Sequence, residues 1–207
     1  MSIKAVIWDL GGVLVRTEDF THRESLAKSL GMTRADLEEL AFGLESGKRA
    51  QLGEYSIDQH WENVRRSLEL TKQEMDSFKE TFWAGDALDT DLIDYIRSLR
   101  VTYSTALLSN AFTNLRYMLN SVWKIADAFD DLIISAEVGL IKPDKRIYQL
   151  TVERLDVEPS DAVFIDDFQH NIDGAKAVGL FALRFQNPTQ IRADLVRILN
   201  EGTGKNV

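Results

Sequence analysis

The stretch VIWDLGGVLV, residues 6–15, joins a continuous apolar run to an acidic residue and two glycines. An apolar run without alternation is typical of a strand that is buried on both faces of a sheet. The run ends at Asp9, and Gly11 and Gly12 behind it predict a tight turn. In open α/β sheets ligands bind beyond the carboxyl ends of the strands, so an acid at this point indicates a functional site.

Five apolar runs of this kind predict the strands of a core. They cover residues 5–8, 102–108, 132–134, 162–165 and 181–185. Amphipathic helical patterns separate the later runs, with apolar residues every three or four positions. Strands that alternate with helices are joined by right-handed crossovers into a parallel sheet. The predicted fold class is therefore α/β, with a Rossmann-like parallel sheet as its core.

Residues 16–86 interrupt this alternation, and no strand is predicted there. Two patterns within the segment have helical spacing: Leu37, Leu40 and Leu44, then Ile57, Trp61, Val64 and Leu68. We predict a helical cap inserted at residues 16–86 into an α/β core formed by residues 1–15 and 87–207. Four aromatic side chains are expected to fill the interior of this cap: Trp61, Phe78, Phe82 and Trp83.

The composition limits the possible classes of function. The 207 residues suffice for one domain with an insertion, and the formal net charge of −9 argues against a nucleic-acid groove, which needs a basic stripe. No apolar run approaches the roughly 20 residues that span a bilayer. The chain has no cysteine, so disulfides and thiolate metal sites are excluded. We expect a cytoplasmic protein that binds neither nucleic acid nor membrane, and the sequence leaves the oligomeric state open.

Polar residues follow the predicted strands at the point where each strand ends. They are Asp9, Ser109 with Asn110, Lys142, and Asp166 with Asp167. Each has an ordinary explanation when taken alone, such as a turn, a helix cap or a solvated side chain. Two adjacent acids, however, repel each other unless a cation or hydrogen-bond donors lie between them. Because parallel strands end at one edge of the sheet, the whole set predicts a site there.

These side chains suit phosphoryl transfer. Asp9 is placed to attack phosphorus as a nucleophile, which gives an aspartyl-phosphate that water then hydrolyses. Asp9 and Asp167 offer the carboxylate oxygens that a magnesium ion prefers. The Ser109 hydroxyl, nearby backbone N–H groups and the Lys142 ammonium would bind the remaining phosphate oxygens.

Four segments, in this order, resemble the four motifs of the haloacid dehalogenase-like hydrolase superfamily. They are VIWDLGGVL, LLSNA, GLIKPDKRIY and VFIDDFQHNIDGAKAVG. The insertion after the first motif resembles the helical cap of the subgroup whose cap lies between the first two motifs. Within it, LGEYSIDQHW resembles cap sequences of bacterial members that act on small sugar phosphates.

The resemblance implies a role for each residue at the strand ends and a small phosphorylated metabolite as the partner. By this resemblance, Asp9 is the nucleophile, and Ser109 and Asn110 bind the phosphate. Lys142 contacts both the nucleophile and the phosphate. Asp9 and Asp167 bind magnesium, with Asp166 as a secondary ligand. The cofactor that it implies is Mg²⁺.

The chain departs from the family pattern at Gly11. The second acid of the first motif, which protonates the leaving group in this family, falls on that position. The family's metal contact there is a backbone carbonyl, which Gly11 retains. General acid–base assistance is typically worth about 10² to 10⁴ in rate. We therefore expect leaving groups that depart readily as anions, such as an anomeric sugar hydroxyl, an acyl group or a phenol.

Three hypotheses about function stay open at this point. The first is a magnesium-dependent phosphatase that hydrolyses small phosphomonoesters, sugar phosphates among them, through an aspartyl-phosphate on Asp9. The second is a metal-independent 2-haloacid dehalogenase, which Gly11 suits but in which a pair of adjacent acids has no use. The third is a non-catalytic phosphate-binding relative, against which the intact phosphate-binding residues argue.

Three histidines and one asparagine have smaller expected roles. His22, His60 and His170 lack metal-ligand spacing, and we expect them on the surface or in loops. His170 lies beside the fourth motif, where a minor role in the site is open to it. Asn171 is expected to orient the neighbouring acids at the start of the next helix.

Overall fold

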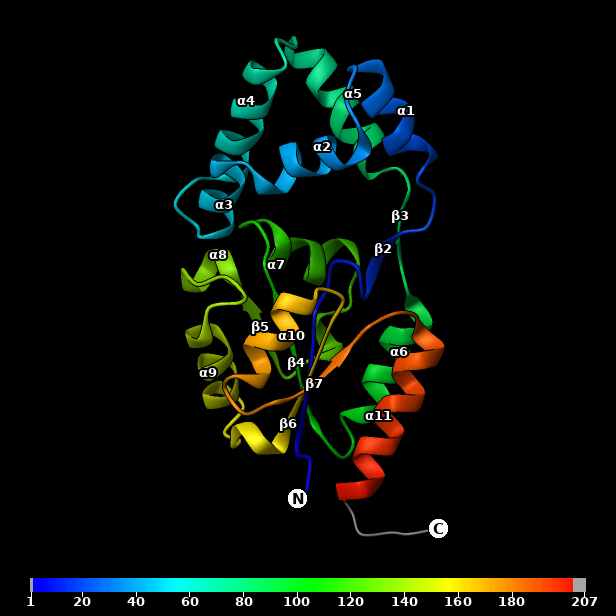
Figure 1. The fold of residues 1–207 in the computed structure, drawn as a ribbon, viewed down its shortest axis with the longest axis vertical. Helices are drawn as coiled ribbons and strands as arrows, with labels where there is room; N and C mark the ends of the chain where they lie inside the picture. The colour runs from blue at the N-terminus through cyan, green and yellow to red at the C-terminus, as the bar shows by residue number, and fades with distance from the viewer. Residues whose placement is uncertain (1, 203–207) are drawn as a thin grey trace.

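A five-stranded parallel sheet forms the core of the molecule (Figure 1). The structure is a computed structural model that describes residues 2–202. The strand order is β5-β4-β1-β6-β7, with β1 (Ala5–Trp8), β4 (Ser104–Ser109), β5 (Asp131–Ile134), β6 (Ala162–Asp166) and β7 (Phe181–Arg184). All adjacent strands are parallel, and all five predicted strands are present. The predicted α/β fold is confirmed.

The two faces of the sheet enter two separate hydrophobic cores. In β1, Val6 and Trp8 point into one core and Ala5 and Ile7 into the other, following the two-residue repeat of a strand. Helices α6 (Thr90–Leu99) and α11 (Pro188–Gly202) cover the first face, and α9 (Lys145–Arg154) and α10 (Gln169–Lys176) the second. Short elements complete the core: α7 (Leu115–Tyr117), η2 (Met118–Val122), η3 (Ala126–Ala128), α8 (Ser135–Val138) and η4 (Pro159–Asp161).

The helices within residues 18–85 form a group at one end of the molecule (Figure 1). They are α1 (Thr21–Ser29), α2 (Arg34–Glu38), the π-helix η1 (Glu39–Gly43), α3 (Glu45–Gln51), α4 (Ile57–Ser67) and α5 (Lys72–Trp83). Helices α2, α4 and α5 each begin with a capping box, which satisfies backbone N–H groups of the first turn. Their apolar faces meet in a third hydrophobic core. Across residues 2–202, every helix is too short or too polar to serve as a membrane span.

The prediction that residues 16–86 contain no strand is wrong at both ends of the segment. Strands β2 (Val15–Thr17) and β3 (Asp86–Leu88) pair antiparallel, so both chain crossings between the core and the helical group lie in one ribbon. Arg23 of α1 donates to both Asp86 carboxylate oxygens at 2.9 Å, which fastens the ribbon to the helical group. We propose that residues 16–86 are a cap on a core of residues 1–15 and 87–207. Residues 1 and 203–207 of this core lie outside the part of the chain that the structure describes.

One histidine and one tryptophan differ from the expectation for the helical group. The prediction that His60 lies on the surface or in a loop is wrong, because the residue is fully buried in α4. Its ring nitrogens bond to the Ser46 hydroxyl at 3.0 Å and to the Ala41 carbonyl at 2.8 Å, so burial leaves neither nitrogen unpaired. Trp83 is 40% exposed, whereas the other three aromatic residues are buried as predicted: Trp61, Phe78 and Phe82.

Candidate active site

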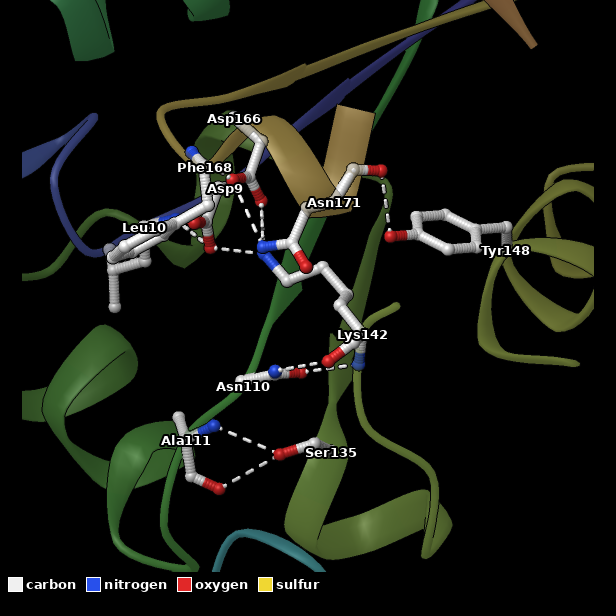
Figure 2. Close-up of polar contacts among 10 residues, drawn as sticks. All are labelled: Asp9, Leu10, Asn110, Ala111, Ser135, Lys142, Tyr148, Asp166, Phe168 and Asn171. Carbon is white, nitrogen blue, oxygen red and sulfur yellow. Dashed lines mark hydrogen bonds and ion pairs between the residues drawn. The ribbon is translucent and has the colours of Figure 1, made fainter. Parts of the chain in front are cut away.

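The residues predicted to form the site meet at the carboxyl end of the sheet, beside the central strand β1. Strands β4 and β6 flank β1 on opposite sides, and this reversal of strand order is where open α/β sheets bind ligands. Asp9 directly follows β1, Ser109 ends β4 and Asp166 ends β6. Lys142 reaches the same place from the loop between α8 and α9, as Figure 2 shows.

Lys142 lies between two carboxylates. Its Nζ is 2.7 Å from Asp9 Oδ1 and 2.7 Å from Asp166 Oδ2. Burial alone would lower the pKa of the Lys142 ammonium, but the charges of Asp9 and Asp166 outweigh burial and raise that pKa. Lys142 therefore stays protonated and fixes the positions of both carboxylates.

The backbone of Lys142 is also held in place. Its N–H donates to Asn110 Oδ1 at 2.8 Å, and Asn110 Nδ2 donates to the Lys142 carbonyl at 3.0 Å. We predicted Asn110 as a phosphate binder; in the structure its side chain holds the lysine loop, and a phosphate contact stays a prediction. The Ser135 hydroxyl fixes the loop after β4 in a similar way, accepting from the Ala111 N–H at 2.9 Å and donating to the Ala111 carbonyl at 3.2 Å.

Asp166 is surrounded by hydrogen-bond donors (Figure 2). Its Oδ1 accepts from the Phe168 N–H at 2.8 Å, and its Oδ2 accepts from Lys142 at 2.7 Å. Asn171 Nδ2 lies 3.0 Å from both oxygens. These contacts engage both oxygens, so the main effect of Asp166 is to position Lys142. The geometry agrees with the expected role of Asn171 in orienting the acids.

Helix α9 supports Asn171 in turn. The Tyr148 hydroxyl, fully buried, donates to the Asn171 carbonyl at 2.9 Å. Tyr148 and Ser135 are supporting residues that the sequence analysis missed. Ser135 directly follows the third predicted strand, so the rule that strand ends carry function could have found it. Tyr148 lies within a helix and has no comparable signal.

Asp9 and Asp167 each keep a carboxylate oxygen available for a ligand. Both donors to Asp9, the Leu10 N–H and Lys142 Nζ, contact Oδ1 at 2.7 Å. Within the described residues no donor contacts Asp9 Oδ2, and the buried Oδ1 of Asp167 is likewise without a partner there. Buried polar atoms are rarely unpaired in folded proteins, so Asp167 Oδ1 is a candidate for binding a ligand.

The three carboxylates fit a divalent cation. One oxygen from each of Asp9, Asp166 and Asp167 lies within 4.8 Å of the others. Their three negative charges against the one positive charge of Lys142 leave two negative charges, which a divalent cation would balance. Gly12 makes room for this group: its φ is +75°, and a Cβ there would lie 2.3 Å from Asp167 Oδ2. Oxygen-only donor sets of this kind suit hard cations such as magnesium or calcium.

The acids in this cluster resist ionisation when no cation is present. Burial raises the pKa of Asp9 against the opposing charge of Lys142, and the charge of Asp166 adds to the rise. Burial, followed by the charge of Asp166, raises the pKa of Asp167 to about 6. Because a cation must displace these protons, its binding strengthens as the pH rises.

Ser109 and Gly11 complete the set of predicted residues. Ser109 is 4% exposed, and its hydroxyl has no hydrogen-bond partner within residues 2–202, which leaves it free for a phosphate oxygen. Gly11 is exposed, and a Cβ there would meet nothing within 4 Å. A metal contact through its carbonyl stays a prediction.

Comparison with known proteins places these features in a family context. The model of the haloacid dehalogenase-like hydrolases matches residues 3–179. D-ribitol-5-phosphate phosphatase from Bacteroides thetaiotaomicron is 30% identical over 96% of this chain and 99% of its own. (S)-2-haloacid dehalogenase 1 from a Pseudomonas species is 27% identical over 67% of this chain and 64% of its own.

A solved structure shows a similar fold. An enzyme of the HAD family from Bacteroides thetaiotaomicron, in complex with magnesium and inorganic phosphate, superposes with a TM-score of 0.74. The alignment covers 92% of this chain and 99% of that one, at 21% identity.

Proposed function

The chain belongs to the haloacid dehalogenase-like hydrolase family, and within it we propose a magnesium-dependent phosphatase that hydrolyses small phosphomonoesters. The observation that carries the proposal is the cluster of Asp9, Asp166 and Asp167 around Lys142, with two negative charges left to balance. The 30% identity to D-ribitol-5-phosphate phosphatase, over nearly the full length of both chains, supports a small phosphorylated metabolite as the substrate.

Asp9 is the nucleophile in this proposal. Its free Oδ2 bonds to phosphorus while the bond from phosphorus to the leaving oxygen breaks on the opposite side, which gives an aspartyl-phosphate. The leaving group departs as an anion and takes its proton from water, because Gly11 offers none. Water then attacks the phosphorus, loses a proton to solvent, and releases phosphate with the Asp9 carboxylate restored. Lys142 holds Oδ1 throughout, which keeps the nucleophile in one orientation.

The other residues of the site bind the phosphate and the metal. The Ser109 hydroxyl, Asn110 and the Lys142 ammonium would bind phosphate oxygens. The residues that would hold Mg²⁺ are Asp9, Asp167, the Gly11 carbonyl and, as a secondary ligand, Asp166. Magnesium, when bound, shields the negative charge that phosphoryl oxygens and carboxylates bring together.

The dehalogenase hypothesis leaves Asp167 without a purpose. A metal-independent displacement of halide needs a nucleophile and a lysine, and it gains nothing from a second carboxylate with a raised pKa beside the first. The non-catalytic hypothesis leaves the free Asp9 Oδ2 and the paired Lys142 unexplained. We therefore favour the phosphatase.

Phosphate release from a panel of sugar, acyl and aryl phosphates tests the proposal. We expect turnover that needs Mg²⁺, that EDTA abolishes, and that falls by about 10³-fold or more in Asp9→Asn. Equal activity of Asp9→Asn and the wild type, or no turnover with any ester in Mg²⁺, would contradict the proposal. Halide release from a 2-haloacid in EDTA would instead support the dehalogenase.

A further inference from the structure

An aromatic cluster joins the helical group to the loop after β4. The ring of Phe42 stacks on that of Phe112, with centroids 6.4 Å apart and planes 17° apart. The Trp83 ring meets Phe42 edge-on at 5.8 Å. Phe42 is half-buried and Trp83 is 40% exposed, so the cluster keeps accessible aromatic surface at the boundary between the helical group and the core.

Side chains from neighbouring helices hold the backbone at Phe42. Phe42 lies in the π-helix η1, and π-helical turns are rare and often occur at functional sites. The His60 Nε2–H donates to the Ala41 carbonyl at 2.8 Å, and the Gln51 amide donates to the Phe42 carbonyl at 3.0 Å. These bonds satisfy carbonyl groups that the end of the helix would otherwise leave open. The Phe42 ring is therefore presented from a fixed backbone.

The geometry of the reaction directs the leaving group toward the helical group, and the aromatic cluster lies where this group meets the core. Phosphoryl transfer places the nucleophile and the leaving oxygen on opposite sides of phosphorus. Asp9 lies at the carboxyl end of β1, so the leaving group extends away from the sheet, and the helical group lies beyond that end (Figure 1). Phe112 follows the phosphate binder Ser109 by three residues and contacts Phe42, which links the cluster to the site.

We propose that Phe42, together with Phe112 and Trp83, determines specificity by packing against the leaving group; the proposal rests on the phosphatase function. An aryl group or the CH-rich face of a sugar ring packs well on an aromatic ring, whereas a short alkyl group gains little. The substrate class is then phosphomonoesters with a ring in the leaving group. Gly11 favours part of this class independently, because a phenol or an anomeric hydroxyl departs readily as an anion.

Binding of two inert phosphonates tests this contact without requiring turnover. Phenylphosphonate and methylphosphonate share the anionic head and differ by the ring. By titration calorimetry in Mg²⁺, we expect the wild type to bind phenylphosphonate about tenfold more tightly. In Phe42→Leu this preference is expected to fall about three- to tenfold, with the affinity for methylphosphonate unchanged.

Two further variants make the result specific. Phe78→Leu is the matched control, because its ring lies in the same hydrophobic core but contacts Trp61 and Phe82. It should lower the melting temperature and leave the ring preference intact. Phe112→Leu removes the ring on the core side and should act like Phe42→Leu, which provides a second test if that variant does not fold.

Two outcomes separate this inference from the proposed function. Equal affinities for the two phosphonates in the wild type, or an unchanged preference in both ring variants, would overturn the inference even if esters are hydrolysed. A clear ring preference in a protein that releases no phosphate from any ester would contradict the phosphatase proposal and leave the aromatic contact in place.

Discussion

Gly11 and Gly12 are adjacent, but the structure requires glycine only at the second position. The φ of Gly12 is +75°, and any Cβ there would collide with the Asp167 carboxylate. Gly11 has no left-handed φ, and a Cβ there would have nothing within 4 Å. Packing therefore does not account for the missing acid at Gly11, and a side chain fits at that position.

Gly11→Asp is expected to broaden the range of leaving groups. A carboxyl group there could donate a proton to the departing oxygen, which matters most when the leaving group is a poor one. We expect kcat/KM for an alkyl phosphate to rise about 10²-fold and that for p-nitrophenyl phosphate to change little. The measurement is the dependence of kcat/KM on the pKa of the leaving group across a series of esters.

Gly11→Ala serves as the control for this substitution. Alanine fills the same space and carries no proton, so its dependence on the leaving group should match that of the wild type. If Gly11→Asp and Gly11→Ala hydrolyse alkyl phosphates at the same rate, the missing acid is not what limits these substrates.

Asp167 makes stability depend on pH when no metal is bound. Burial raises its folded pKa to about 6, above an unfolded value near 3.9, so the folded state binds more protons than the unfolded state between these values. The contribution of the Asp167 carboxyl to the free energy of unfolding is therefore fully present below about pH 4. This contribution is lost as the pH rises through about 6. In EDTA, we expect the wild type to lose roughly 2–6 °C in melting temperature between pH 4.5 and 7, relative to Asp167→Asn.

Adding Mg²⁺ should reverse this loss in the wild type. The cation replaces the protons on the carboxylates, and Asp167→Asn lacks one of its ligands. Asp173→Asn, which removes an exposed carboxylate from α10, should keep the wild-type dependence on pH and on Mg²⁺. Identical pH dependence of Asp167→Asn and the wild type in EDTA would disprove this account.

The sequence predicts residues of the site well where strands place them and poorly elsewhere. Asp9, Ser109 and Asp166 lie at strand ends, and the structure brings all three to one edge of the sheet. The positioning role of Tyr148 was not predictable, because its hydroxyl reaches a backbone carbonyl on another helix. The burial of His60 was missed for the same reason: its two partners lie 14 and 19 residues away in the sequence.

Helix α10 approaches the lysine loop closely at one glycine. A Cβ on Gly174 would lie 2.9 Å from Pro143 Cβ, 3.0 Å from the Pro143 carbonyl oxygen and 3.1 Å from the Tyr148 ring. Pro143 directly follows Lys142. The close packing of these two elements thus helps to set the position of a site residue that neither Gly174 nor Tyr148 contacts directly.

Gly174→Ala is expected to reduce turnover more than stability. The added methyl group pushes the loop that carries Lys142, and small misplacements in a site can cost up to about 10² in rate, so we expect kcat to fall about tenfold. Alanine also favours the helix by about 1 kcal/mol, which offsets the strain in the folded state. Steady-state kinetics and thermal melting together measure both effects.

Lys176→Ala, an exposed change on the same helix, should leave turnover unchanged. Unchanged kcat in Gly174→Ala would show that the loop accommodates the methyl group without moving Lys142. A parallel loss of kcat and of melting temperature in both variants would indicate general destabilisation of α10 instead.

Apolar patterning predicts the secondary structure of the core, and it fails at the shortest elements. Strands β1, β4, β5 and β6 of the parallel sheet are mostly buried, and the sequence shows an apolar run in each of them. The edge strand β7 is partly exposed, but its first three residues are apolar as well. Strands β2 and β3 have three residues each and are not fully buried, so they carry no such run. The π-helix η1 depends on bonds from His60 and Gln51, which local spacing does not reveal.

At the scale of the whole molecule, three hydrophobic cores can be separated, and the third belongs to the helical group alone. The first two lie on the two faces of the sheet and share strand β1. A segment with its own core can in principle hold its structure without its neighbour. The sheet and its four covering helices have hydrophobic cores of their own, so they too can in principle hold their structure without the helical group.

The pairing of β2 with β3 means that the chain leaves the core and returns to it at neighbouring points, with Thr17 opposite Asp86. Two antiparallel strands can be closed by a two-residue Asn-Gly turn. Replacing residues 18–85 with that dipeptide should thus yield a miniature protein that still folds cooperatively, judged by a single sharp melting transition. It should retain Mg²⁺-dependent hydrolysis of acetyl phosphate and lose its selectivity among larger phosphate esters. A product without a melting transition would show that the sheet needs the helical group in order to fold.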